Sequence, residues 1–590
     1  MEFALGQVTQ QSAAGAFSSV HKRSHGIGLT AAVCAFLIVT YYNVILSWAW
    51  AYLIGSFTSG PLPWEKDRDT QSESSDPSVQ SFFEQSVLNQ APFGDVSGLG
   101  PVYWKPALGA LANWLLTYLC VFKSVSSIGA VIYITLPLPF VLLLIIFLYS
   151  SSLDGFGKGI SYYMGVNDDA STLAKGNVWA DAGAQIFFGL SVCESSQIAY
   201  GSKNPSDSRP ARNGWIVALA NSCSSLFAGF VIFAGIGYLS EKNGDAVDDI
   251  VKGGWALAFE VYPAVIARLP NGAKQTISIV FWLMLLMLGI DSSFALAEGV
   301  IQLLCDSFGG AERYHKLTAA CVCLSGFLIG LPLMTSNGYD VLEIQDTYIS
   351  RVTLIIVGLC ESITIGWVYG AKRFDSLVRR VAGRGMGIVW IITFKYVTPM
   401  LLFALFVWNI ANEASRSSDS PINDYPFWAI VVFGWGYGVI LPLGLGLLCG
   451  FFPTHGISSL KFAPGVDTSE HADGYHFRDG EADSRPGEAS MSLSSLELAE
   501  RSAAPVSSDD QVMQEAEENE GATVVNPRSK RKRGTSLDHS GNGNSHIRSG
   551  ESREDQEGDG RVNSDGGLAG IGKHLSQAIL RPNMYRWRQI

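Results

Sequence analysis

Apolar and polar stretches alternate along the first 452 residues of the chain, with ten apolar runs of about 20 residues. A helix needs about 20 mostly apolar residues to cross the hydrocarbon core of a bilayer. The pattern therefore predicts an all-α, multi-span membrane protein with ten transmembrane helices. The predicted helices cover residues 27–53, 104–121, 128–149, 179–200, 213–239, 278–304, 317–334, 349–369, 388–410 and 426–452.

The fourth apolar run, residues 179–200, interrupts its own helix. Gln185, Gly189, Ser191 and Glu194 stand in the middle of a segment that is otherwise suited to lipid. Polar groups at this depth are costly unless they face one another or a cavity. Interrupted membrane helices commonly line binding sites, because their freed backbone groups can hold ions and solutes. This run is therefore the first candidate for a binding site.

The charges of the loops orient the predicted helices. Loops rich in lysine and arginine alternate with acidic loops such as residues 64–95 and 241–260. Basic loops lie on the cytoplasmic side of most membrane proteins, which places both ends of the chain in the cytoplasm. The partly apolar loop 241–271 is expected to fold as short helices on the protein surface.

The composition changes at about residue 454, where serine, glycine, aspartate and glutamate replace the apolar runs. Two parts are therefore predicted: a transmembrane domain, residues 1–453, and a disordered cytoplasmic tail, residues 454–590. The basic cluster at residues 528–533 could contact anionic lipids or act as a trafficking signal, but a solvated charge run is the favoured interpretation. The tail is also where protein partners would bind.

Other classes of function find little support. All nine cysteines lie in or beside apolar runs, which indicates small hydrophobic residues rather than a disulfide framework. No HExxH sequence appears, and the glycines of GFGKGIS at residues 155–161 lack the spacing of a phosphate loop. The chain is therefore predicted not to be an enzyme, and nothing in it predicts nucleic-acid binding.

Five sequence stretches resemble the neurotransmitter:sodium symporter family. They are YYNVILSWAWAYLIGSF with the LPW that follows, VWADAGAQIFFGLS, NSCSSLFAGFVIFAGIGYLSE, LGIDSSFALAEGVI and EIQDTY. They are similar, in the same order and spacing, to the family's third, sixth, seventh, eighth and tenth spans. The resemblance covers residues 1–452 and implies the family's inverted-repeat fold.

The family has twelve spans, whereas this chain shows ten. MEFALGQ at residues 1–7 is similar to the cytoplasmic end of the family's second span. The first span and most of the second are therefore expected to be missing, through an incomplete gene model or a truncated product. In the family, the first span supplies half of the substrate site and carbonyls for both sodium sites.

The resemblance implies two sodium sites. The second site would use the Leu288 carbonyl and the side chains of Asp291 and Ser292. A carboxylate inside a membrane favours a nearby cation, although a solvated helix end or a protonated Asp291 is the alternative. For the first site, Asn221 matches the family, but Gly189 stands where the family usually has serine or threonine.

Chloride dependence stays open. Gln185 and Ser225 match two of the family's chloride ligands. The hydroxyl at position 189 is absent, and so is the tyrosine of the second span.

The remaining site residues follow from the same resemblance. Tyr42 matches a substrate-contacting tyrosine, and Asp346 matches the acid of an outer gate whose arginine partner would lie in the first span. Each aromatic or apolar residue alone would indicate lipid-facing or core packing, but together they favour a pocket. The expected substrate-binding residues are Ile38, Tyr42, Phe188 as an aromatic lid, Ser191, Glu194, Ser293 and Leu296.

Glu194 is the main departure from the family, which usually has an aromatic or small apolar residue there between glycines. It could pair with a cationic substrate, bind a proton or replace the lost hydroxyl at the sodium site. Alternatively, it turns toward the cytoplasmic water path and does little.

The sequence thus predicts sodium-coupled symport of an amino acid or a related amine or osmolyte, by alternating access in the plasma membrane. The truncated chain itself would be inactive. The alternative is a transport-dead membrane scaffold or interaction protein. The substrate, the ion stoichiometry and the oligomeric state are not determined by the sequence.

Overall fold

The protein is seen in a computed structural model, which describes residues 1–65, 77–90, 99–122, 133–165, 176–307, 314–415 and 425–451. All of these residues belong to one unit of the chain, Met1–Ala472 with Leu575–Ile590. They form α-helices, short 3₁₀- or π-helical segments and turns, with an isolated β-bridge between Val102 and Thr335. The predicted tail, residues 454–590, lies outside the described residues, so its disorder stays a prediction.

The first half of the described chain contains α1 (Glu2–Thr9), α2 (Ala13–Val20), η1 (Lys22–Ser24), α3 (His25–Ser56), α4 (Pro77–Ser81), η2 (Phe82–Leu88), α5 (Trp104–Val121), α7 (Pro137–Ser150), α8 (Phe156–Tyr163), α9 (Gly176–Leu190), α10 (Ser196–Ser202) and α11 (Pro210–Asn243). The second half contains α12 (Val247–Ile250), η4 (Leu257–Val261), α13 (Tyr262–Arg268), α14 (Lys274–Ser307), α15 (His315–Gly330), η6 (Leu331–Met334), α16 (Gly338–Tyr348), η7 (Ile349–Thr353), α17 (Leu354–Ile363), η8 (Thr364–Gly370), α18 (Ala371–Ala382), α19 (Ile388–Ile392), η9 (Thr393–Val397), α20 (Thr398–Ser415), α21 (Phe427–Ala429), η10 (Ile430–Ile440) and α22 (Leu441–Phe451).

Eight stretches of the described chain are long and apolar enough to cross a membrane. The other two predicted spans correspond to α5, which has 18 residues, and to the broken pair α9 and α10. The all-helical prediction is confirmed for the described residues, while the count of ten spans stays a prediction. The eight stretches are Lys22–Ser56, Tyr133–Ser150, Pro210–Asn243, Lys274–Ser307, His315–Met334, Gly338–Ala382, Ile388–Glu413 and Phe427–Gly450.

One predicted boundary is wrong. The helical stretch assigned to residues 349–369 begins at Gly338, and α18 follows it from Ala371, after Gly370 with a φ angle of 94°. Its first part contains the polar EIQDTY stretch, which hydropathy alone assigns to a loop. Ile344, Gln345 and Tyr348 are buried there, because neighbouring helices cover them and replace lipid as their surroundings.

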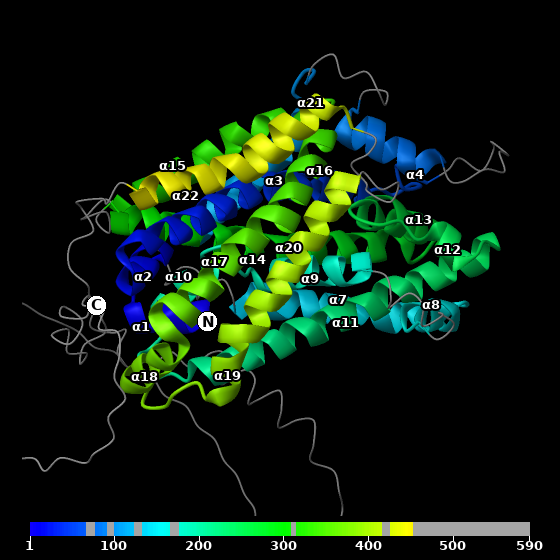
Figure 1. Cartoon of the computed structure of the whole chain (residues 1–590). Coiled ribbons are helices and arrows are strands. Elements are labelled where there is room, and N and C mark those ends of the chain that lie inside the picture. The colour runs from blue at the N-terminus through cyan, green and yellow to red at the C-terminus, as the bar shows by residue number, and fades with distance from the viewer. Residues whose placement is uncertain are drawn as a thin grey trace, which may run out of the picture. The chain divides into compact units, whose positions relative to one another are not determined.

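The long helix α3 lies at the centre of the packing. Its residues are apolar on all faces, which is typical of a helix that is buried all round. It packs against α14, α5, α22 and α2, and its Cys34, Ala35 and Val44 are fully buried. Figure 1 shows α3 within the helix bundle, with α1, α2 and α10 gathered near its N-terminal end. A continuous helix of this kind gives the neighbouring broken helix a fixed wall.

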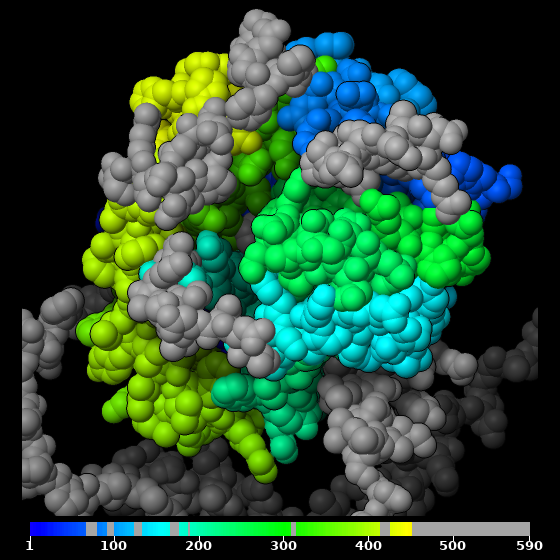
Figure 2. All heavy atoms as spheres, turned by 90° about the vertical axis from the view of Figure 1, so that its right-hand side faces the viewer, coloured from blue at the N-terminus to red at the C-terminus, as the bar shows by residue number. Residues whose placement is uncertain are grey.

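Loop 241–271 folds as predicted into the short helical segments α12, η4 and α13, but its expected place on the surface is only partly right. Phe259 and Tyr262 are buried at 1% and 2% exposure. The Phe259 ring lies 5.4 Å from the Trp48 ring of α3, measured between centroids. The aromatic residues of this loop draw it into the core, whereas α12 stays outside beside α8, which is cyan in Figure 2.

Two glycines bring α1 against α10. A Cβ atom at Gly6 would collide with the Ile198 carbonyl, and a Cβ atom at Gly201 would collide with the Phe3 carbonyl. Any larger residue at either position would push the two helices apart. This contact places the start of the chain beside the break in the fourth predicted span.

Candidate functional site

The predicted break is confirmed as a turn at residues 191–195, between α9 and α10. Ser191, Cys193 and Ser195 have φ angles of 48°, 65° and 59°. This left-handed region costs a residue with a Cβ atom about 1–2 kcal/mol, and such conformations cluster at functional sites. The Gln197 side chain donates a hydrogen bond of 2.7 Å to the Leu190 carbonyl that the break frees. The turn is therefore stabilised by a hydrogen bond from a neighbouring side chain to its backbone.

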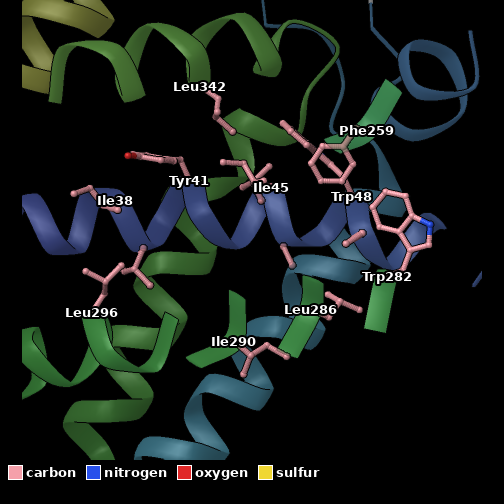
Figure 3. Close-up of a cluster of buried hydrophobic side chains, with 14 of the residues drawn as sticks. Ile38, Tyr41, Ile45, Trp48, Phe259, Trp282, Leu286, Ile290, Leu296 and Leu342 are labelled. Carbon is pink, nitrogen blue, oxygen red and sulfur yellow. The ribbon is translucent and has the colours of Figure 1, made fainter. Parts of the chain in front are cut away.

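The wall opposite the turn comes from α3 and α14. Ile38 and Leu296 are 2% and 4% exposed and belong to the same buried cluster, which Figure 3 shows on the two helices. Ser293 is fully buried and donates a hydrogen bond of 3.3 Å from Oγ to Oδ1 of Asn43. These three predicted substrate-binding residues are thus brought together, with Asn43 as an added polar group.

Leu288, Asp291 and Ser292 lie on one side of α14, as spacings of three and four residues require. The Tyr42 hydroxyl forms a hydrogen bond with the Ser292 side chain, and the Asp291 carboxylate forms one with Thr135. One oxygen of that carboxylate, Oδ1, is buried and has no hydrogen-bond partner among the described residues. A carboxylate oxygen, a hydroxyl and a backbone carbonyl are hard oxygen ligands, so this set suits a small cation such as sodium.

The two residues predicted for the first sodium site are neighbours. A Cβ atom at Gly189 would lie 3.0 Å from the Asn221 side-chain nitrogen Nδ2. A serine or threonine at position 189 would therefore place its hydroxyl beside the Asn221 amide. Because glycine has no hydroxyl, only the amide and the backbone carbonyl of this pair can serve as ligands.

The two predicted chloride ligands are not joined into a site. Gln185 on α9 and Ser225 on α11 have exposed side chains, although the two helices are in contact. Within the described part of the chain, no hydrogen bond joins them. The structure therefore places both residues on neighbouring helices without forming an anion site from them.

Asp346, the predicted acid of the outer gate, lies on α16 and accepts a hydrogen bond of 2.8 Å from the Tyr41 hydroxyl. Another acid of the same helix, Glu343, accepts a hydrogen bond of 2.8 Å from Tyr425. Burial, followed by the nearby Glu343 carboxylate, raises the pKa of the Tyr425 phenol. Tyr425 therefore stays a neutral donor across the physiological range, and this end of α16 is tied to its neighbours through tyrosine–carboxylate contacts.

Glu194 is buried at 2% exposure, and its carboxylate forms a hydrogen bond with the Ser191 side chain. It lies close enough to Tyr41 and Tyr42 to interact with them electrostatically. Glu194 interacts electrostatically with Glu2 of α1 as well. The side chain of Phe188, the predicted lid, lies outside the described residues.

Sequence reasoning missed three functional candidates near this turn. Glu2, Cys193 and Glu361 each offer a ligand atom, and these atoms lie within 4.8 Å of one another. Glu361 could have been noticed as a carboxylate within a predicted span, by the same argument that identified Asp291. No local pattern joins the three, since they are separated by 191 and 168 residues.

These features define a class of protein before any comparison. A broken membrane helix faces a continuous apolar pair, and polar groups lie between them inside a multi-helix bundle. This arrangement is typical of transporters, whose sites lie where a discontinuous helix meets the bundle.

The comparison with protein families also indicates a transporter and identifies its family. Residues 1–448 match the model of the sodium:neurotransmitter symporter family, so the chain belongs to that family. The predictions of a multi-pass membrane protein, and of a transporter family rather than an enzyme, are confirmed.

Several curated proteins are similar to this chain. The bovine sodium-dependent dopamine transporter is 32% identical over 453 residues, covering 74% of this chain and 64% of that protein. The creatine transporter of Torpedo marmorata is 30% identical over 462 residues, covering 74% and 73%. The bovine sodium- and chloride-dependent taurine transporter is 31% identical over 460 residues, again covering 74% and 73%. The chain thus spans just under two thirds of the dopamine transporter and somewhat more of the other two.

Proposed function

We propose that this protein moves a small organic solute across the plasma membrane together with sodium, by alternating access. The substrate would be an amino acid, an amine or a related osmolyte. Family membership supports the class of activity, and the names of the relatives cover an amine, creatine and taurine.

The observation that carries the proposal is the Asp291 carboxylate. One of its oxygens is buried without a hydrogen-bond partner in the described part of the chain. Removing a charge from water is costly unless an opposite charge meets it. A sodium ion held by Asp291, Ser292 and the Leu288 carbonyl would provide that charge, and its binding would be coupled to the pocket through the Ser292–Tyr42 hydrogen bond.

The substrate would bind between the turn at residues 191–195 and the wall formed by Ile38, Ser293 and Leu296. Phe188 would close over it as a lid, and Asp346 would belong to the outer gate. Glu194 would face this pocket, and its burial and its electrostatic interaction with Tyr41 and Tyr42 support this assignment. A buried carboxylate at this place favours a substrate with an amino or other cationic group, which would offset its charge.

Sodium coupling would rest mainly on the Asp291 site, with Gly189 and Asn221 as a reduced first site. Chloride coupling is the less supported part of the proposal, although the taurine carrier among the relatives is named as chloride-dependent. Gln185 and Ser225 would be its ligands, and Gly189 removes the hydroxyl that would stand nearest to Asn221.

Uptake by a full-length clone tests this function. Radiolabelled amino acids, amines and osmolytes would be offered to cells in sodium medium and in medium with N-methylglucamine, with and without chloride. At least one substrate should accumulate only in sodium. No sodium-dependent uptake across the panel, by a clone that reaches the cell surface, would refute the symporter.

The expected truncation needs a separate test, namely the genomic and transcript sequence upstream of Met1. An in-frame segment encoding a helix similar to the family's first span would support a transporting full-length protein. A mature transcript that lacks it would instead favour the alternative, a membrane scaffold that does not transport.

A further inference from the structure

A second polar cluster lies behind the turn at residues 191–195, away from Asp291. Glu2 comes from α1, Cys193 from the turn and Glu361 from α17. The Cys193 backbone N–H donates a hydrogen bond of 3.1 Å to Glu2 Oε1, and its thiol donates to Glu361 Oε2 at 3.8 Å. Three segments far apart in the sequence thus bring two carboxylates and a thiol to one place.

These groups are buried inside the protein. Glu2, Cys193 and Glu361 are 6%, 0% and 1% exposed. Glu2 Oε2 and Glu361 Oε1 have no hydrogen-bond partner among the described residues, and no lysine, arginine or histidine in that part of the chain forms an ion pair with them. Each carboxyl group therefore keeps one buried oxygen that is available to a ligand.

We propose that Glu2, Cys193 and Glu361 form a binding site for a divalent metal ion of the zinc type. Zinc prefers thiolate sulfur and carboxylate oxygen, at about 2.3 Å and 2.0 Å, in tetrahedral geometry. Those bond lengths place a sulfur and an oxygen about 3.5 Å apart around one ion. The observed Cys193–Glu361 separation of 3.8 Å is close to this value. On binding, the Cys193 thiol loses its proton to water, and the fourth position is left for a water molecule.

The choice of a metal over a shared proton rests on the cysteine. Two neighbouring carboxyl groups can lower their repulsion by sharing one proton, which needs no sulfur. Cys193, however, stands at a φ angle of 65°, where glycine is favoured and a side chain is strained. A thiol placed between the two carboxylates at this position completes a three-ligand set, which is the number that zinc sites with an open position use.

The site goes beyond the proposed transport function and does not depend on it. A bound ion would join α1, the turn and α17, and so restrain the turn that separates α9 from α10. Because the three residues are buried, the ion would enter only when the turn opens.

The test uses the full chain purified in detergent, loaded slowly with Cd²⁺ as a spectroscopic substitute for Zn²⁺. Wild-type protein should bind one tightly held Cd²⁺ with a sulfur neighbour, detected by X-ray absorption and by metal content after dialysis. Cys193→Gly should lose the sulfur signal and weaken binding at least tenfold. Its backbone suits the left-handed conformation, so the variant is expected to fold. Cys323→Ser, which changes another buried cysteine, should behave as wild type.

Three results would overturn the site. The first is the absence of stoichiometric metal in the wild type. The second is a Cd–S signal that persists in Cys193→Gly. Glu361→Gln provides an independent check, since it keeps the cysteine and should still weaken binding at least tenfold. If Zn²⁺ and Cd²⁺ leave the thermal unfolding temperature of the wild type unchanged while acidification shifts it, the two carboxyl groups share a proton and the metal site is wrong.

Discussion

Two carboxylates lie next to the proposed pocket, one on a continuous helix and one in the turn that breaks a helix. Asp291 lies on α14, a continuous helix of 34 residues, where Ser292 and Leu288 share its side. Glu194 lies in a turn, and the residues on either side of it, Cys193 and Ser195, adopt left-handed conformations. A regular helix presents ligands at fixed spacings, whereas a broken helix brings in groups from distant parts of the chain. The comparison shows that the residues proposed for the ion site are local in sequence, whereas the surroundings of Glu194 come from distant parts of the chain.

Replacing Asp291 by asparagine should have the largest effect. The change removes the only full charge of the proposed sodium set, and losing one partner of a buried charge pair costs about 3 kcal/mol or more. The apparent sodium affinity in uptake should therefore fall roughly a hundredfold. Asp249→Asn, at an exposed position of α12, is the matched control. An unchanged sodium dependence of Asp291→Asn would contradict the assignment.

Glu194→Gln should have an intermediate effect. Hydrogen bonds to charged groups contribute about 1.5–3 kcal/mol, so losing the charge should change the preference between cationic and neutral substrates by roughly tenfold or more. Competition uptake with paired substrates measures this ratio, and sodium titration shows whether coupling changes as well. If the uptake kinetics equal those of the wild type, Glu194 does not face the pocket.

Tyr41→Phe tests the contact between α3 and the proposed outer gate. It removes the donor of a 2.8 Å hydrogen bond and leaves the Asp346 carboxylate with one partner fewer. An unsatisfied buried group costs about 1–3 kcal/mol, so thermal unfolding in detergent should occur at a lower temperature. Tyr42→Phe, one residue further on the same helix, should instead affect uptake more than stability. Equal effects of the two variants on stability would show that the Asp346 contact is not special.

Glycine substitutions should give the smallest and most diagnostic difference. Ser195→Gly relieves a left-handed φ angle and removes a buried hydroxyl without a partner in the described part of the chain, so it should stabilise the protein by about 1 kcal/mol. Ala35→Gly, in the buried part of α3, should destabilise it by about the same amount. Denaturant or thermal unfolding of both variants measures the contrast. Destabilisation by Ser195→Gly would show that the turn is not strained.

Much of the fold follows from the sequence, because long apolar runs have few other stable states in a membrane. Helices occur at all the predicted runs that the structure describes, and the break at residues 191–195 was indicated by its polar residues. Hydropathy did not predict that the helix starts at Gly338, because neighbouring helices bury its polar residues, although the resemblance placed EIQDTY in a span. The same holds for loop 241–271, whose aromatic residues pack against α3.

Some residues of the candidate site could be grouped from sequence spacing, and others could not. Leu288, Asp291 and Ser292 could be grouped from sequence spacing, because a helix places residues three and four apart on one side. The grouping of Gly189 with Asn221 and of Ile38 with Leu296 rested on resemblance, and the structure brings each pair close or into one cluster. Their roles in binding stay predictions.

The sequence by itself thus determined the apolar helices, the position of the break and the shared helix side of Leu288, Asp291 and Ser292. These depend on local periodicity and on the cost of polar groups in lipid. Only the tertiary structure decided that Tyr41 meets Asp346 and that Glu2, Cys193 and Glu361 converge. These contacts join residues more than 150 positions apart, and only the packing of whole helices against one another can specify them.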